Sequence, residues 1–149
     1  MYNKILIATD GSELATQGLS YGLELAKALN VPVTIVTTTE MWSFLEMVAE
    51  ANKRAANNPI ENYEKVAADA AEQILASAEA AAKKLGISCE CVHVADRHPA
   101  EGIIETAASK ACNLIVMASH GRRGVKQVLL GSVAAEVLNN SKIPVLIVR

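Results

Sequence analysis

The chain has 149 residues, a length that fits one domain with a single hydrophobic core. Hydrophobic residues make up 51% of it but aromatic residues only 3%, so aliphatic side chains must build that core, as in layered proteins of sheet and helices. The formal net charge of -2 supplies no broad positive field, which argues against nucleic acid as a partner.

Two features of the sequence favour a soluble protein of the cytoplasm. After Met1 to Lys4 comes a strand-like run of about six residues, too short for a signal sequence or a membrane span. The three cysteines, Cys89, Cys91 and Cys112, lie in apolar segments, which is typical of reduced thiols that pack as small hydrophobic side chains. We therefore expect no membrane contact, no disulfide and no cysteine-built metal site.

The first half of the chain alternates strand and helix patterns. Residues 4 to 9 predict a strand that ends at Asp10-Gly11-Ser12, and Glu13 to Asn30 has helical spacing of its leucines. Gly18 and Gly22 lower the helix propensity there, so we expect close packing around them. Residues 31 to 38 are rich in β-branched side chains and predict a second strand.

The next segment is the hardest to assign. We interpret Thr39 to Pro59 as a mobile insertion whose apolar residues form either a partner-binding patch or a lid over the end of the second strand and a ligand there. Residues 60 to 85 predict a long helix that ends at Gly86. The residues expected along its buried stripe are Val66, Ala70, Ile74, Ala78 and Ala81.

The second half repeats the alternation. The expected elements are a strand over Ile87 to Ala95, a helix over Ala100 to Ala111 entered through Pro99, a strand over Leu114 to Ser119, a helix over Val133 to Asn140, and a strand over Ile143 to Arg149. Strict alternation of strands and helices predicts an α/β fold: one domain over residues 1–149, with a five-stranded parallel open sheet and helices on both faces, Rossmann-like in architecture.

In such open sheets ligands bind at the carboxyl ends of strands, and two turns fall there. One is the Asp10 turn, and the other is the segment Ser119 to Ser132, which contains Gly121, Gly124 and Gly131 and leads into the last helix. Glycines allow backbone N–H groups to approach an anion, and a helix N-terminus favours negative charge. This segment matches neither the Walker A loop nor the dinucleotide fingerprint, but it predicts a cradle for phosphate.

Simpler interpretations exist for the polar residues of both turns. Asp10 or Ser12 could only cap the first helix, and Arg123 and Lys126 could be solvated charges. We interpret His120 as a turn histidine bonded to backbone, and no histidine or acidic partner stands at the spacing of a metal site. No protein-built metal site is therefore expected, although Mg²⁺ could arrive with phosphates.

Enzyme chemistry is the less favoured interpretation. Neither Ser12 nor Ser132 has a sequence-evident base and orienting acid, and no nucleophile elbow is present. A hydrolytic or acyl-transfer enzyme is the second class to consider. We expect no catalytic residue, and at most weak ATPase activity, because a water-positioning residue and an arginine finger are not evident.

Three pieces of sequence together resemble the universal stress protein family, over essentially the whole chain. They are Thr9-Asp10-Gly11-Ser12, Ala118-Ser-His-Gly121 ahead of Gly131-Ser132, and the terminal Ile143-Pro-Val-Leu-Ile-Val. The resemblance is to the ATP-binding branch and implies a sheet like that of the adenine nucleotide alpha hydrolases. The branch carries Gly-x2-Gly-x9-Gly-Ser/Thr, and alanine replaces its first glycine at Ala118.

The resemblance also implies roles for individual residues. Asp10 would contact the ribose of ATP, and Thr38, past the second strand, would offer backbone atoms to the adenine. The phosphates would lie against the segment from Ala118 to Arg123 and against the helix start, on Gly121, Gly131, Ser132 and Val133, with Arg123 adding charge.

Function and assembly follow from the same resemblance. It implies a stress-response protein that acts through bound ATP as a regulatory or protective factor, and a homodimer formed by pairing of the terminal strands. The alternative, favoured by Ala118, is a family member without nucleotide that acts as a dimeric interaction protein.

Overall fold

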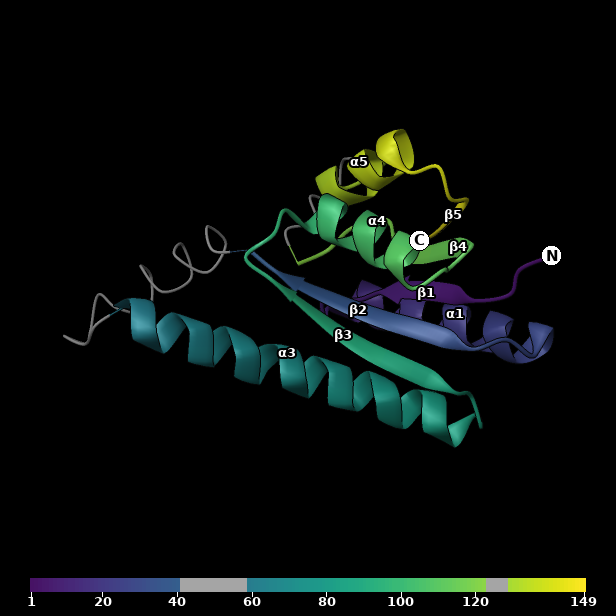
Figure 1. The fold of residues 1–149 in the computed structure, drawn as a ribbon, viewed down its shortest axis with the longest axis horizontal. Helices are drawn as coiled ribbons and strands as arrows, with labels where there is room; N and C mark the ends of the chain where they lie inside the picture. The colour runs from purple at the N-terminus through teal and green to yellow at the C-terminus, as the bar shows by residue number, and fades with distance from the viewer. Residues whose placement is uncertain (41–58, 123–128) are drawn as a thin grey trace.

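Five parallel strands form one open sheet in the order β3-β2-β1-β4-β5 in the computed structural model, which describes residues 1–40, 59–122 and 129–149 (Figure 1). The strands are β1 (Ile5–Ala8), β2 (Val33–Thr39), β3 (Cys89–Ala95), β4 (Leu114–Ala118) and β5 (Val145–Val148), and the helices are α1 (Glu13–Leu29), α3 (Pro59–Lys84), α4 (Pro99–Ser109) and α5 (Ser132–Asn140). The predicted α/β fold is confirmed.

Helices cover both faces of the sheet. Side chains of α1 and α3 pack with one set of strand residues, and side chains of α4 and α5 pack with the alternate set. Figure 1 shows α3 below the sheet and α4 and α5 above it. All residues of β1 and β4 are buried, because helices enclose these strands on both faces. Strands without a solvent face have continuous apolar sequences.

Helix α1 begins and ends where its caps predict. The Ser12 hydroxyl accepts from the Ala15 N–H at 3.2 Å, and Asn30 closes the helix in the left-handed conformation with φ 53°. The expected close packing is confirmed at Gly22, where an added Cβ would lie 2.6 Å from Cδ1 of Ile7. Glycine there brings the helix axis close to the sheet.

Helix α3 corrects the predicted stripe. Its buried residues in the structure are Tyr63, Ala67, Ala71, Ala78 and Ala82, so of the predicted set only Ala78 is fully buried. Val66 is 41% exposed and lies at the cavity described below. Alanine occurs on several sides of this helix, so periodicity alone could not fix the face that it buries. The predicted stop is confirmed at Gly86, which has φ +72°.

The predicted insertion has different limits in the structure. Thr39 belongs to β2 and Pro59 begins α3, while the intervening residues 41–58, with the apolar patch or lid predicted there, lie outside the described residues. That interpretation stays a prediction.

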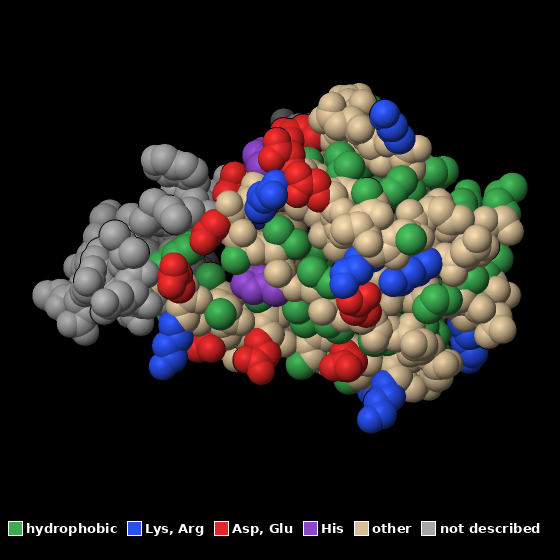
Figure 2. All heavy atoms as spheres, viewed as in Figure 1, with side chains coloured by type: hydrophobic (Ala, Val, Ile, Leu, Met, Phe, Trp, Pro, Cys, Tyr) green, Lys and Arg blue, Asp and Glu red, His purple; other side chains and the backbone are tan. Residues whose placement is uncertain are grey.

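The surface of this molecule mixes charges of both signs. Figure 2 shows Lys and Arg interspersed with Asp and Glu on one face. Ion pairs join Glu90 to Lys4 and Lys110, and Arg97 to Glu105. In the described part of the chain, every helix is too short or too polar to cross a membrane.

Candidate functional site

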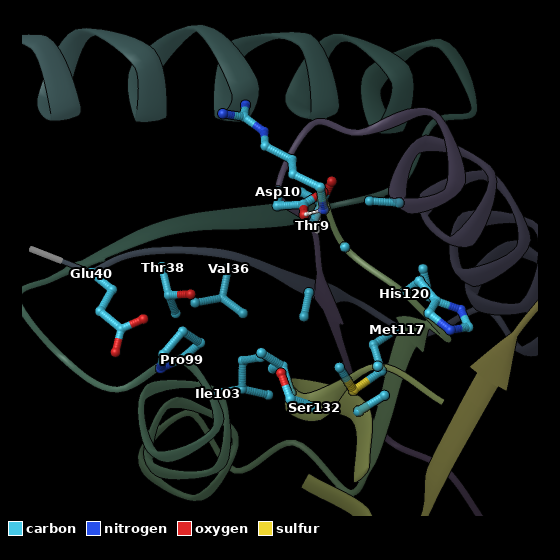
Figure 3. Close-up of a pocket in the computed structure, with 18 of the residues that line it drawn as sticks. Thr9, Asp10, Val36, Thr38, Glu40, Pro99, Ile103, Met117, His120 and Ser132 are labelled. Atoms are coloured by element: carbon cyan, nitrogen blue, oxygen red, sulfur yellow. Dashed lines mark hydrogen bonds between the residues drawn. The ribbon is translucent and has the colours of Figure 1, made fainter. Parts of the chain in front are cut away.

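A cavity of about 680 Å³ opens at the carboxyl edge of the sheet. It lies where the chain leaves β1 and β4, two adjacent strands whose following helices cover opposite faces. This is the switch point at which open α/β sheets bind ligands. The residues that line it come from seven elements and the loops between them: Thr9, Asp10, Val36, Thr38, Glu40, Val66, His98, Pro99, Ile103, Met117, Ala118, His120, Gly121, Arg122, Leu130, Gly131, Ser132, Val133 and Glu136 are among them (Figure 3).

Asp10 joins the two predicted turns. Its Oδ1 accepts from the backbone N–H of Ser12 at 2.9 Å, and its Oδ2 accepts from the backbone N–H of Arg122 at 2.9 Å. Ser12, not Asp10, caps α1. The carboxylate therefore holds the β1 turn and the β4 turn together at one rim, as the sequence predicts.

The glycines of the site make room for this contact. A Cβ on Gly121 would lie 2.6 Å from Oδ2 of Asp10, so any side chain there would displace the carboxylate. Gly11 has φ +75°, a conformation that other residues rarely adopt. A Cβ on Gly131 would lie 3.1 Å from the Ser119 carbonyl oxygen, to which the Gly131 N–H donates at 2.7 Å.

The start of α5 presents backbone donors to the cavity. Gly131 is the N-cap and provides no side-chain oxygen, so the N–H groups of Ser132 and Val133 are among those that a helix leaves without an internal partner. Both residues line the cavity. A helix N-terminus without an acidic first turn favours an anion at this place.

The position of Thr38 relative to the second strand differs from the predicted one. Thr38 lies inside β2, not past it. Thr9 N–H donates to Val36 O on the β1 side, whereas Thr39 O accepts from Asp96 on the β3 side. Because backbone groups alternate along a strand, the N–H and C=O of Thr38 point to the β1 side, beyond the last residue of β1. They face the cavity edge.

Ala118 lines the cavity, and its methyl group lies on the α1 face of the sheet. It follows Leu114 and Val116 in the alternation of β4, and those two side chains pack with α1. A Cβ built on Gly18 of α1 would lie 3.7 Å from the Ala118 Cβ, and Ala118 is not among the non-glycine residues with positive φ. Gly18 thus leaves room for the methyl group of Ala118, which stands where the family carries glycine.

The hydrogen-bond partner of His120 differs from the predicted one. Nδ1 of His120 lies 3.0 Å from the Ser119 hydroxyl oxygen, a side-chain contact and not the expected backbone one. Its Nε2 is buried and has no hydrogen-bond partner among the residues that the structure describes. Figure 3 shows the ring away from Thr38 and Glu40, at the far end of the site. Ser119 is 3% exposed, so a substrate has little access to this pair, and no described residue bonds to the other ring nitrogen as an orienting acid.

Some residues of the site were not predicted from the sequence, and some predicted residues lie outside the part of the chain that the structure describes. Arg123 and Lys126 lie outside the described residues, while the backbone of Arg122 provides the contact to Asp10. Glu40 was not predicted. Its spacing of two from Thr38 on one strand was the signal that could have found it.

A contact between two side chains at the cavity, His98 and Glu136, was also not predicted. Nδ1 of His98 lies 3.3 Å from Oε2 of Glu136, which joins the start of α4 to α5. Both side chains line the cavity. Nothing in the sequence paired these two residues, because they approach each other only when α4 and α5 pack side by side.

Metal and thiol chemistry find little support in the geometry. Among the residues that the structure describes, no three His, Cys, Asp or Glu side chains gather as metal ligands. Burial, followed by the neighbouring Cys89 and Glu79, raises the pKa of Cys91 to about 11. Burial also raises the pKa of Cys89. Both thiols stay protonated near neutral pH and pack as small apolar groups.

Comparison with known proteins agrees with this geometry. YxiE, a universal stress protein of Bacillus subtilis, is 32% identical over 156 residues, which cover 100% of both chains. The solved structure of MJ0577 of Methanocaldococcus jannaschii has a TM-score of 0.78 and 28% identity, covering 99% of this chain and 96% of that one.

Two further solved structures hold nucleotides. A universal stress protein in complex with cAMP has a TM-score of 0.69 at 26% identity, covering 99% of this chain and 97% of that one. A universal stress protein of Archaeoglobus fulgidus in complex with dAMP has a TM-score of 0.69, covers 99% and 98%, and at 22% identity shows the shared fold. The model of the universal stress protein family matches residues 1–149, and the chain belongs to that family.

Proposed function

We propose that the protein binds ATP in the cavity at the carboxyl edge of its sheet and acts in the stress response through the bound state. The observation that carries this proposal is the hydrogen bond from Arg122 N–H to Asp10 Oδ2, which brings the two turns to one rim beside the bare start of α5. Two proteins of this fold form complexes with cAMP and dAMP, which supports an adenine nucleotide as the ligand.

The cavity suits each part of that ligand. Its volume of about 680 Å³ is in the range of small-molecule sites. Val36, Ile103 and Met117 are apolar residues of the cavity lining, and Asp10 lines the same cavity, where a ribose hydroxyl can donate to its carboxylate. The N–H groups of Ser132 and Val133 would receive the phosphates.

We propose a regulatory or protective role in the cytoplasm, with slow hydrolysis at most. Mg²⁺ would arrive with the phosphates, because it keeps most of its ligands as water and phosphate oxygen. The Ser119 and His120 pair does not argue for an enzyme, since Ser119 is buried and adjacent in sequence to its partner. An ATP turnover that survives purification and disappears in a loop variant would contradict this part of the proposal.

A substitution at the start of α5 tests the binding. Ser132→Asp places a carboxylate where the phosphates would lie, yet an acidic residue in the first turn stabilises a helix by about 0.3–1 kcal/mol. Calorimetric titration with ATP and Mg²⁺ should show binding to the unmodified protein and at least about tenfold weaker binding to the variant, the effect expected of like charges at close range. The melting temperature should not fall.

Ser132→Asn is the matched control. It has nearly the size of aspartate but no charge, so it should keep most of the affinity. Equal affinity of the Asp variant and the unmodified protein would contradict the phosphate cradle at α5. Absence of ATP binding to the unmodified protein would instead favour the dimeric interaction protein without nucleotide, and the absorbance ratio at 260 and 280 nm of freshly purified protein gives an early indication.

We also propose a homodimer through β5. This strand lies at the edge of the sheet, and Leu146 is 41% exposed on it. An apolar edge strand offers unpaired backbone groups to a second copy. Pro144 O and Val148 O accept from β4, so by alternation the backbone N–H of Ile147 faces the open edge. Ile147→Pro removes that outward N–H, so light scattering should report a monomer. An unchanged dimer mass would place the interface elsewhere.

A further inference from the structure

We propose that Glu40 recognises the exocyclic amino group of the base and makes the site selective for adenine over guanine nucleotides. This inference rests on the proposed function and concerns the far end of the same cavity. Glu40 lines that cavity and is half-buried at the end of β2.

The pleat of β2 places Glu40 in line with the expected base site. Side chains two residues apart on a strand share a face, so Val36, Thr38 and Glu40 stand in one row. Val36 packs in the cluster formed with α4 and α5, which identifies the face. Figure 3 shows the three residues side by side along β2, with Pro99 and Ile103 of α4 opposite them.

Close packing fixes the inner end of this row. A Cβ on Gly102 would lie 3.3 Å from Cγ2 of Thr38, so α4 approaches β2 closely at that point. Beyond it the two elements diverge into the cavity, where Glu40 and Pro99 both line the wall. A flat base in that part of the cavity would thus present its edge to β2.

The direction of β2 determines which atom meets Glu40. Along the strand the Thr38 N–H comes first, then the Thr38 C=O, then Glu40. Adenine offers an acceptor at N1 beside the two hydrogens of its N6 amino group. With N1 on the Thr38 N–H and one N6 hydrogen on the Thr38 C=O, the second N6 hydrogen points onward along the strand, toward the carboxylate of Glu40.

Guanine presents the opposite pattern to the same three groups. Its O6 would face the Thr38 C=O and the Glu40 carboxylate, which are acceptors, and its N1–H would face the Thr38 N–H, which is a donor. Where two acceptors or two donors meet, the buried polar groups stay without a hydrogen bond. This lowers the affinity for a guanine nucleotide strongly. In the described part of the chain no cation forms a salt bridge with Glu40, so its charge remains to act on the base.

The test compares ATP, GTP and inosine triphosphate, whose base carries O6 and N1–H like guanine. Calorimetric titration of the full chain should give a dissociation constant for ATP at least about tenfold lower than for the other two, as expected for a hydrogen-bonding mismatch. Glu40→Gln should narrow this ratio, because its amide can accept from N6 or donate to O6. Glu40→Ala should narrow it as well.

Glu136→Gln is the matched control. It removes the same charge from the same cavity, but on α5, next to the phosphate cradle and bonded to His98. It should change the affinities for ATP and GTP by the same factor and leave their ratio as in the unmodified protein. Circular dichroism melting should show that all three variants fold.

The outcomes separate the two proposals. If ATP binds and the ratio of ATP to GTP affinity is unchanged in both Glu40 variants, the inference is overturned while the proposed function stands. If the unmodified protein binds ATP and GTP equally well, selectivity by Glu40 is likewise overturned. If it binds neither, both proposals fail together.

Discussion

Arg122 donates its backbone N–H to Oδ2 of Asp10 at 2.9 Å, a contact between residues 112 positions apart in the chain. The other carboxylate oxygen accepts from Ser12 N–H at the same distance. A charged acceptor shared by two backbone donors orders both turns at once, and ordering before a ligand arrives lowers the entropic cost of binding it. Asp10 is therefore a positioning residue even without nucleotide.

Asp10→Asn tests this role. The side-chain amide keeps one acceptor oxygen but places an NH₂ group against the second N–H, so one of the two bonds must break. Hydrogen bonds to charged groups contribute about 1.5–3 kcal/mol, so we expect a loss of that order in the free energy of unfolding. Urea denaturation measures it, and amide exchange at Arg122 should accelerate.

Asp69→Asn is the control for this variant, because Asp69 is exposed on α3 and makes the same chemical change far from both turns. Its effect on stability should be within about 0.5 kcal/mol. Unchanged exchange at Arg122 in the Asp10 variant would show that the bond does not order the turn.

Gly121→Ala should be harmful because of the same carboxylate. The new Cβ would lie 2.6 Å from Asp10 Oδ2, which must then move away from the Arg122 amide. In an Asp10→Ala background that oxygen is absent, so the second substitution should have a much smaller effect. A double-mutant cycle by urea denaturation should give a coupling of roughly 0.5–3 kcal/mol. If the two changes in the free energy of unfolding simply add, glycine at position 121 is required for its backbone conformation and not to leave room for the Asp10 carboxylate.

The order of helices and strands could be predicted, because each has a recognisable hydrophobic pattern in the sequence. The buried face of a helix and the contacts between distant residues could not. The start of α5 and the Asp10 turn were evident from strand ends and glycines. The buried side of α3 was not, since alanines flank it on several sides. The predicted strand ended at Thr38, whereas β2 continues to Thr39, beyond the end of β1, where it pairs with β3 alone.

The missed site residues depend on tertiary geometry. The Arg122 contact uses a backbone amide, for which every residue type is equivalent in the sequence. His98 and Glu136 come together only through the packing of α4 on α5. In the sequence, Ala118 favoured a family member without nucleotide, and only the structure shows its methyl group opposite Gly18.

Gly22→Ala should destabilise the protein although alanine is the better helix former. The gain in helix propensity is about 1 kcal/mol. The added Cβ, however, would lie 2.6 Å from Cδ1 and 2.9 Å from Cγ1 of Ile7, which is fully buried. Overpacking of a dense core costs about 1–3 kcal/mol, so we expect a net loss on the order of 1 kcal/mol by urea denaturation.

Two comparisons isolate the steric cause at Gly22. Gln17→Ala, at an exposed position of the same helix, should leave stability within about 0.5 kcal/mol. Ile7→Val removes the Cδ1 atom, so Gly22→Ala should be better tolerated in that background than in the unmodified protein. Stabilisation by Gly22→Ala alone would show that α1 can move away from the sheet at little cost.

Alkaline pH should weaken the fold through Cys91. Its pKa is raised from 9.0 to about 11, with burial as the largest cause. Above pH 9 the unfolded chain loses this proton while the folded chain keeps it, so the stability is full below pH 9 and falls as the pH approaches 11. Cys91→Ala should flatten that decline in urea denaturation series, and curves parallel to those of the unmodified protein would contradict the assignment.

Ala118→Gly restores the glycine that the ATP-binding branch carries at this position, yet we expect no gain in ATP affinity. The methyl group faces Gly18 of α1, and Ala118 does not need a positive φ, so glycine should leave the backbone contacts to the ligand unchanged. Glycine in a strand interior costs about 0.5–1 kcal/mol, so urea denaturation should show a small loss of stability. Calorimetric titration with ATP should give the same dissociation constant within about twofold, since no contact to the ligand changes. A clear rise in affinity would mean that the Ala118 methyl obstructs the ligand, and it would revise the position of the ribose relative to β4.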